Sequence, residues 1–132
     1  MDNNEKKKKV IDELERRKKI VENYLDSVDS SSKDFDSYAH VCHKTWYYLI
    51  DNALDFVRDN FVEYNECDYS TYESYRESID KCCEKSPFLI IYRITKSNFN
   101  CIITYIGKTI DDINSNYYPD DPYEIFKEVE NW

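Results

Sequence analysis

The side chains best suited to metal or thiol chemistry are His40, Cys42 and His43, followed by the cysteines Cys67, Cys82, Cys83 and Cys101. His40 and His43 can share a helical face, but Cys42 points elsewhere, and the chain has no Cys-x-x-Cys pair of the kind that zinc sites use. A thiol nucleophile needs a neighbouring histidine, whereas Cys42 and His43, as consecutive helical residues, face about 100° apart. We therefore expect free thiols and ordinary histidines, with no metal and no cofactor.

The last part of the chain is acidic and rich in tyrosine. Seven carboxylates and a single lysine, Lys127, lie between Thr109 and Trp132, with three tyrosines among them. Tyrosine supplies contact area at low entropic cost, and carboxylates steer association with a positive surface, although a surface that only keeps the protein solvated has the same composition. The predicted partner-binding residues are Asp111, Asp112, Tyr117, Tyr118, Asp120, Asp121, Tyr123, Glu124 and Glu128.

Two segments have the composition of β-strands, Phe88–Thr95 and Cys101–Ile106. Both are rich in β-branched and aromatic residues, and the turn-prone Lys96–Asn100 lies between them, which predicts an antiparallel hairpin with a five-residue loop. Both faces of the first strand are apolar over its first half, so we expect helices from the rest of the chain to cover the hairpin.

The sequences Ile91-Tyr-Arg-Ile-Thr95 and Tyr105-Ile-Gly-Lys-Thr109 resemble the paired strand motifs of the GIY-YIG nucleases. The resemblance covers residues 91–109, and by it Tyr92 and Tyr105 are the motif tyrosines and Gly107 fits the second motif. In that family the two tyrosines border a metal-dependent site that cleaves DNA. The resemblance therefore implies a nuclease-like domain, active or degenerate.

Helical patterns flank the predicted hairpin. Apolar residues at intervals of three and four predict a charged first helix and a long second one. Ser70-Thr-Tyr-Glu73 is interpreted as the capping box of a short helix, and Asp121-Pro-Tyr-Glu124 as the start of a last helix that ends on a docked Trp132. The predicted helices cover residues 4–25, 35–64, 70–86 and 121–132, and a polar linker covers residues 26–33.

Charge and composition bound the class of protein. The net charge is −9, of which residues 1–25 contribute +2, and so acidic a body repels phosphate, which argues against direct nucleic-acid binding. Five cysteines without a signal peptide, and no apolar run near the roughly 20 residues of a membrane span, predict a protein of the cytoplasm or host nucleus that is neither secreted nor membrane-bound. Abundant Ile, Asn, Lys and Tyr is typical of AT-rich genomes, including those of many viruses and phages.

Together these patterns predict an α+β fold in which three to four helices pack on a small antiparallel β-hairpin. Residues 1–132 form a single domain, with a charged helix and linker over 1–30 and an acidic body over 31–132. We expect a small non-enzymatic interaction protein, of viral or phage type, that inhibits a nucleic-acid-handling host protein by binding its basic surface as a nucleic-acid mimic. The alternatives are the nuclease-like domain and a helical scaffold acting through residues 1–25. The open edges of the hairpin also predict a possible homodimer.

Overall fold

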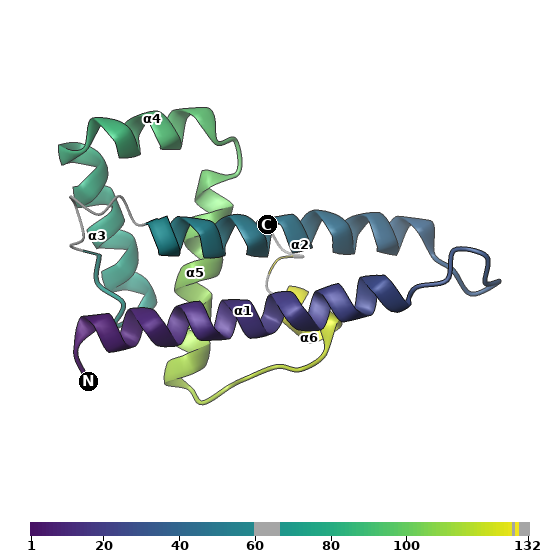
Figure 1. Ribbon diagram of the computed structural model, residues 1–132. Helices are drawn as coiled ribbons and strands as arrows, with labels where there is room; N and C mark the ends of the chain where they lie inside the picture. Colours follow the sequence, from purple (N-terminus) through teal and green to yellow (C-terminus); the bar gives the residue numbers. More distant parts are fainter. Residues whose placement is uncertain (60–66, 128, 130–132) are drawn as a thin grey trace.

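The computed structural model describes residues 1–59, 67–127 and 129, and the regular structure within them is entirely helical. Two long antiparallel helices, α1 and α2, cross in front of α5, while α3 and α4 lie at one end of the molecule (Figure 1). The short α6 packs against α1. The helices are α1 (Asn3–Ser27), α2 (Ser37–Asp59), α3 (Tyr72–Lys85), α4 (Pro87–Thr95), α5 (Phe99–Asn114) and α6 (Pro122–Phe126).

The first two helices form a hairpin. Asp2 caps α1 by accepting a hydrogen bond from the backbone N–H of Glu5 at 2.9 Å, and Asp36 supports the first turn of α2 by accepting from Ala39 N–H at 3.1 Å. Along α1 the buried positions recur at intervals of three and four residues, so one stripe of the helix faces α2 and α5. One face of α1 therefore belongs to the core. The buried residues of α1 are Val10, Glu13, Leu14, Arg17 and Val21.

The central helix is α5, which contacts α1, α2 and α3. Its side chains Ile102, Tyr105, Ile106 and Ile110 are at most 2% exposed. Gly107, the single glycine of the chain, lies among them, and a Cβ atom at this position would lie 2.5 Å from Cδ2 of Tyr72. The missing side chain therefore lets the Tyr72 ring of α3 lie directly against the backbone of α5.

The predicted β-hairpin is wrong. Phe88–Thr95 lies in α4 and Cys101–Ile106 lies in α5, and the described residues contain no strand, so the fold is all-α rather than α+β. The start of α4 shows why a helix forms there. The hydroxyl of Ser86 accepts from Leu89 N–H at 3.1 Å, and Pro87 occupies the first turn, where a helix leaves the N–H unpaired in any case.

The second predicted strand continues as a helix because its apolar pattern does not stop at Gly107. Ile110 and Ile113 extend the spacing of Ile102, Ile103 and Ile106 by about two further turns, which indicates a helix rather than a strand of six residues. The helix is buried by neighbours on several sides, so its composition is as apolar as that of an internal strand. The open strand edges from which a homodimer was expected are therefore absent from the described residues.

The starts of α3 and α6 can also be compared with the predicted helix starts. The capping box of α3 consists of Thr71 and Ser74, not Ser70 and Glu73: Thr71 Oγ1 accepts from Ser74 N–H at 3.0 Å, and Ser74 Oγ accepts from Thr71 N–H at 2.9 Å. The last helix begins at its predicted cap, Asp121, whereas Trp132 and residues 60–64 of the predicted second helix lie outside the described residues. Within the described ranges, no helix combines the length and the hydrophobicity needed to cross a membrane.

Candidate protein-interaction surface

Of the predicted partner-binding residues, the eight that the structure describes lie at the end of α5, in the segment that follows it and at the start of α6. The backbone reverses at Asn116, which has a φ of 57°, and Tyr117 N–H donates to the carbonyl of Asp112 at 2.8 Å. Farther along, the carbonyl of Pro119 accepts from Nη2 of Arg16 at 2.6 Å, which fixes the segment to α1. Backbone contacts thus hold the segment in place. Pro119 is buried and Pro122 is half-buried, whereas the other side chains of residues 117–124 are exposed.

Three of the predicted residues, all aspartates, bind the end of a helix or a buried arginine. Asp112 Oδ2 lies 2.8 Å from Arg17 Nη2, and Asp111 Oδ1 accepts from the backbone N–H of Tyr72 at 3.1 Å at the start of α3. Asp121 caps α6 by accepting from Tyr123 N–H at 2.9 Å. These carboxylates stabilise helix ends or a buried cation, so Asp111 and Asp112 are structural residues, and Asp121 has a structural role in addition to any contact with a partner.

The remaining predicted residues whose side chains are described point outward from residues 117–124. Tyr118 is 46% exposed and Tyr123 is 60% exposed, and Asp120 and Glu124 are also exposed. The hydroxyl of Tyr117 donates to Oε2 of Glu124 at 2.9 Å, and this hydrogen bond raises the pKa of Tyr117. The ninth predicted residue, Glu128, lies outside the described residues.

A contact between Tyr24 and Tyr123 joins this segment to a second acidic segment that the sequence did not reveal. Their hydroxyl oxygens are 3.5 Å apart, and their rings meet edge to face with centroids 6.2 Å apart. The hydrogen bond with Tyr123, followed by burial and by the charges of Asp36 and Asp121, raises the pKa of Tyr24 to about 12. Carboxylates from the α1–α2 connection and from the α6 cap therefore act on one hydroxyl.

Next to this contact lies a hollow of about 360 Å³, whose lining includes Tyr24, Phe35, Tyr123 and three carboxylates of the α1–α2 connection. The hollow and residues 117–124 form one continuous region, because Tyr123 belongs to both. We name this region the acidic–aromatic surface. It consists of Tyr24, Asp29, Asp34, Phe35, Asp36, Tyr117, Tyr118, Asp120, Asp121, Tyr123 and Glu124.

His43 packs beneath the two tyrosines of this surface, on the side of the core. His43 is 2% exposed and stacks on Phe126 of α6, with ring centroids 5.5 Å apart and an interplanar angle of 24°. It also meets Tyr24 and Tyr123 edge to face. Among the described residues, no three His, Cys, Asp or Glu side chains are grouped so that they could hold a metal ion, and the five cysteines are not joined in disulfides. His43 therefore acts as a flat packing surface for α6.

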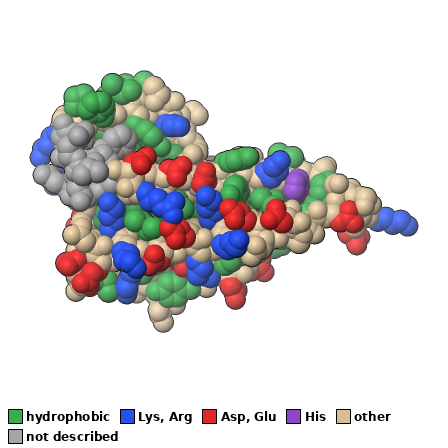
Figure 2. Space-filling model, in the orientation of Figure 1, with side chains coloured by type: hydrophobic (Ala, Val, Ile, Leu, Met, Phe, Trp, Pro, Cys, Tyr) green, Lys and Arg blue, Asp and Glu red, His purple; other side chains and the backbone are tan. Residues whose placement is uncertain are grey.

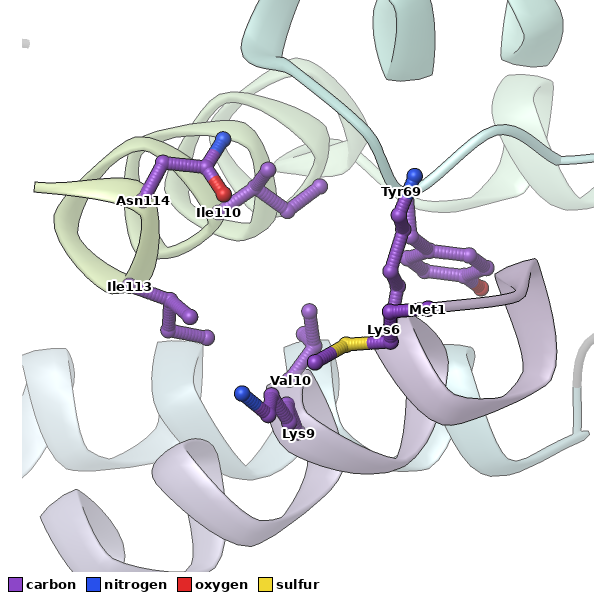
Figure 3. A pocket seen from close by; sticks show the side chains of 8 residues that line it. All are labelled: Met1, Lys6, Lys9, Val10, Tyr69, Ile110, Ile113 and Asn114. Carbon is purple, nitrogen blue, oxygen red and sulfur yellow. The ribbon is translucent and has the colours of Figure 1, made fainter.

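A second hollow, of about 340 Å³, lies near the start of α1 (Figure 3). Val10, Ile110 and Ile113 surround it, and Lys9 lies at its edge. Lys6, also in the lining, donates to the hydroxyl of Ser70 at 3.0 Å. The described residues that line this hollow include no carboxylate, histidine or cysteine, and its ionisable side chains are Lys6, Lys9 and Tyr69.

The tyrosines on which the nuclease resemblance depends lie on two helices. Tyr105, on α5, is fully buried, and its hydroxyl accepts from Arg17 Nη1 at 3.2 Å and donates to the carbonyl of Ile125 at 3.4 Å. Tyr92, on α4, is half-buried against Phe56 and Phe99. Both side chains belong to the packing of the described core, and α4 and α5 stand where the resemblance implies a strand pair.

Comparison with protein-family models, curated proteins and solved structures finds no match for this chain. What the acidic–aromatic surface can do is therefore inferred from its chemistry. Its carboxylates attract cations, and its exposed tyrosine rings offer flat apolar area with a polar edge. Such a surface is suited to binding a positively charged partner.

Proposed function

We propose that the chain is a non-enzymatic interaction protein that binds a positively charged protein surface through the acidic–aromatic surface. The observation that carries this proposal is the contact between Tyr24 and Tyr123, which are 99 residues apart in sequence. The two tyrosines line one hollow together with the carboxylates of the α1–α2 connection. The surface includes six carboxylates, at Asp29, Asp34, Asp36, Asp120, Asp121 and Glu124.

The charge of this surface is poorly compensated. Residues 117–124 contain no lysine or arginine, and residues 29–36 contain only Lys33. A face of one sign raises the rate of encounter with a face of the opposite sign, and this advantage falls as salt screens the charges. On the face that Figure 2 shows, by contrast, basic and acidic side chains lie side by side along α1.

The aromatic residues give the surface an energetic core. Tyrosine is enriched in interfaces because a ring with few rotatable bonds buries much area while its hydroxyl stays hydrogen-bonded. Tyr118 and Tyr123 are exposed, and Asp120, Asp121 and Glu124 lie next to them in sequence. A partner with a basic groove fits this combination, and the grooves of nucleic-acid-handling proteins belong to this class, since they bind phosphates. Occupation of such a groove would make the chain an inhibitor.

The test compares two double charge reversals that change the net charge equally. Asp120→Lys with Glu124→Lys alters the acidic–aromatic surface, and Glu73→Lys with Glu77→Lys alters exposed carboxylates of α3. Affinity purification from the native host cell with the parent chain, at low and high salt, identifies partners, and titration of a purified partner gives each affinity. We expect the first double variant to bind at least about 10-fold more weakly, with a shallower salt dependence, and the second to bind as the parent does.

Equal weakening by both double variants would show that only net charge matters, and unchanged binding by both would remove the proposed surface. Tyr118→Ala adds a test that does not alter charge. It should weaken binding without changing the free energy of unfolding, whereas Tyr48→Ala, at an exposed tyrosine of α2, should leave binding unchanged.

A further inference from the structure

Two buried thiols, Cys67 and Cys82, meet at the end of the molecule that holds α3 and the start of α1 (Figure 1). The thiols form a hydrogen bond with each other, and Cys67 also contacts the hydroxyl of Ser78, one turn before Cys82 on α3. Asp68 N–H donates to Ser78 Oγ at 3.0 Å, and the carbonyl of Cys67 accepts from Nδ2 of Asn3 at 2.6 Å. These contacts hold the two sulfur atoms together without a covalent bond.

Two tyrosine hydroxyls near this pair are buried and have no hydrogen-bond partner among the described residues. Tyr69 is 2% exposed and Tyr75 is fully buried, and their ring centroids are 5.2 Å apart. The charges of Cys67 and Cys82 act on both phenol groups. A buried O–H donor is costly to leave without an acceptor. A neutral thiol accepts weakly and a thiolate accepts strongly, so the two hydroxyls favour a state in which the cysteines are deprotonated.

Metal coordination is one way to deprotonate a buried thiol at neutral pH. Burial raises the pKa of Cys67 to about 12, so the metal-free pair keeps its protons, but a thiol that binds a metal ion loses its proton outright. Thiolate ligands select soft ions such as Cu(I), whereas hard ions such as Mg²⁺ take oxygen ligands. A structural zinc ion needs four ligands, and within the described part of the chain no third His, Cys, Asp or Glu joins this pair. Two thiolates alone therefore suit a soft monovalent ion.

We infer that Cys67 and Cys82 bind one Cu(I) ion between their sulfur atoms, with the hydroxyls of Tyr69 and Tyr75 donating hydrogen bonds to the thiolates. Each S–H bond breaks, each sulfur binds the ion with the electron pair of that bond, and the two protons pass to water. The ion enters and stays as Cu(I), so no electron is transferred. Hydrogen bonds from outer groups orient metal ligands and strengthen binding, and this is the role of the two tyrosines.

A lysine compensates the charge of the bound state. One Cu(I) ion with two thiolates carries a single negative charge, which is unfavourable in a buried site unless a cation lies nearby. The ammonium group of Lys7 acts on Cys67, since its charge opposes the rise in the pKa of this thiol that burial causes. Lys7 is itself half-buried. Together with Lys7 the bound site is neutral.

A surface hollow of about 260 Å³ includes Cys82 in its lining and gives the ion a path to the buried pair. Two lysines and two carboxylates also line this hollow, so the charges of its wall balance. These residues are Asp68, Glu77, Lys81 and Lys85. An ion that approaches through the hollow meets Cys82 first and then Cys67.

A disulfide between the same two cysteines is the other chemistry open to thiols in contact. It would leave the hydroxyls of Tyr69 and Tyr75 without a strong acceptor. Its formation also needs a thiolate nucleophile, which the high pKa of Cys67 makes scarce. The geometry therefore favours ion binding over oxidation. The site shares no residue with the acidic–aromatic surface, so this inference and the proposed function are tested separately.

The experiment is an anaerobic titration of the reduced full chain with Cu(I), in competition with a chromophoric Cu(I) chelator. Native mass spectrometry gives the stoichiometry, and we expect one ion per chain. Cys67→Ala and Cys82→Ala should each weaken binding by more than about 100-fold, beyond the effect of losing an outer hydrogen bond. Cys83→Ala is the matched control and should bind as the parent does, because Cys83 is similarly buried on α3 but its thiol contacts Arg93.

Tyr75→Phe adds a test that keeps both sulfur ligands. It should weaken Cu(I) binding by about 10-fold, because the thiolates lose a hydrogen-bond donor. The metal-free variant should unfold at the same temperature as the metal-free parent or above it, since the lost hydroxyl has no partner there. Thermal unfolding measures this, and Cu(I) should raise the melting temperature of the parent.

A parent chain that binds no Cu(I), or an affinity that both cysteine variants leave unchanged, would overturn the inference. A chain that fails to bind Cu(I) and instead forms a Cys67–Cys82 disulfide under hydrogen peroxide would also overturn it and make the pair a redox site. If the two cysteine variants do not fold, an unchanged affinity in both Tyr69→Phe and Tyr75→Phe would overturn it as well.

Discussion

Arg17 of α1 and Asp112 of α5, 95 residues apart in sequence, form an ion pair of 2.8 Å in which the arginine side chain is 1% exposed. Arg17 Nε also donates to Glu13 at 2.8 Å, and Nη1 donates to the hydroxyl of Tyr105 at 3.2 Å. Burial lowers the pKa of Arg17, but Tyr105, Asp112 and Glu13 together raise it above its usual value. The guanidinium therefore stays charged, and it fixes α1 to the point where the acidic–aromatic surface begins.

Removal of the carboxylate at position 112 should be strongly destabilising. Asp112→Ala leaves a buried cation with one carboxylate, Glu13, and we expect a loss of about 3 kcal/mol in the free energy of unfolding. Urea denaturation at neutral pH measures it. Asp120→Ala is the control, because Asp120 is exposed, and its effect should stay within about 0.5 kcal/mol. Similar losses in both variants would show that the Arg17 pair has no special role.

Replacement of Gly107 tests the close contact between α3 and α5. Gly107→Ala should destabilise the fold by about 1–3 kcal/mol, because the new methyl group meets the Tyr72 ring. In a Tyr72→Ala background the same change should stabilise by up to about 1 kcal/mol, since alanine favours helix over glycine. Thermal or urea unfolding of the four chains measures the coupling. An effect of Gly107→Ala that is the same in both backgrounds would refute the contact.

The fold should lose stability in alkaline solution. Burial, and then the neighbouring Cys82, raises the pKa of Cys67 to about 12, and burial also raises the pKa values of Tyr69 and Tyr75. The folded state holds these protons more tightly than the unfolded state, so the stabilisation is complete below pH about 9 and declines as pH rises toward about 12. Urea unfolding at successive pH values measures the decline.

Cys67→Ala provides the control for this pH dependence. The variant should show a smaller decline between pH about 9 and 10, because the thiol ionises in the unfolded chain before the tyrosines do. A parent chain whose free energy of unfolding is constant across this range would contradict the buried, protonated state of these groups.

Asp121 caps α6 and belongs to the proposed binding surface, and two substitutions separate these two roles. Asparagine keeps a capping oxygen and removes the charge, whereas alanine removes both. Asp121→Ala should destabilise the chain by about 1 kcal/mol and weaken partner binding, while Asp121→Asn should weaken binding with little effect on stability. Calorimetric unfolding and titration of the partner measure the two effects. Equal binding by Asp121→Asn and the parent would restrict Asp121 to its capping role.

Capping residues and periodicity predicted where helices begin better than they predicted which helices pack against each other. The first helix and the cap at Asp121 follow from periodicity and capping residues, and α1 and the start of α6 lie where they were predicted, although α6 ends at Phe126. The segments of α4 and α5 were assigned to strands because β-branched and aromatic residues dominate them and a turn-prone loop separates them, and Gly107 was matched to a strand motif. In fact glycine is required at position 107 because the Tyr72 ring of α3 packs against it, and no local sequence pattern predicts this contact.

The candidate surface was predicted in part. Residues 117–124 follow from composition, since carboxylates and tyrosines are concentrated there. Tyr24 and Asp36 were missed because their membership depends on how α6 packs against α1, a contact between residues about 100 positions apart. Composition also could not show that Asp112 forms an ion pair with Arg17, because the sequence does not distinguish a carboxylate that packs inside the molecule from an exposed one.

The Arg17 pair also bears on how the chain is made. A ribosome adds roughly 5–20 residues each second from the N-terminus, so Arg17 is synthesised several seconds before Asp112. Until then α1 and α2 can associate, but the Arg17 guanidinium stays hydrated because Asp112 is missing. The core residues that α5 covers therefore remain exposed to solvent. The nascent chain therefore closes its core only when α5 is nearly complete, and a truncated product that ends before α5 is a natural substrate for cellular proteases.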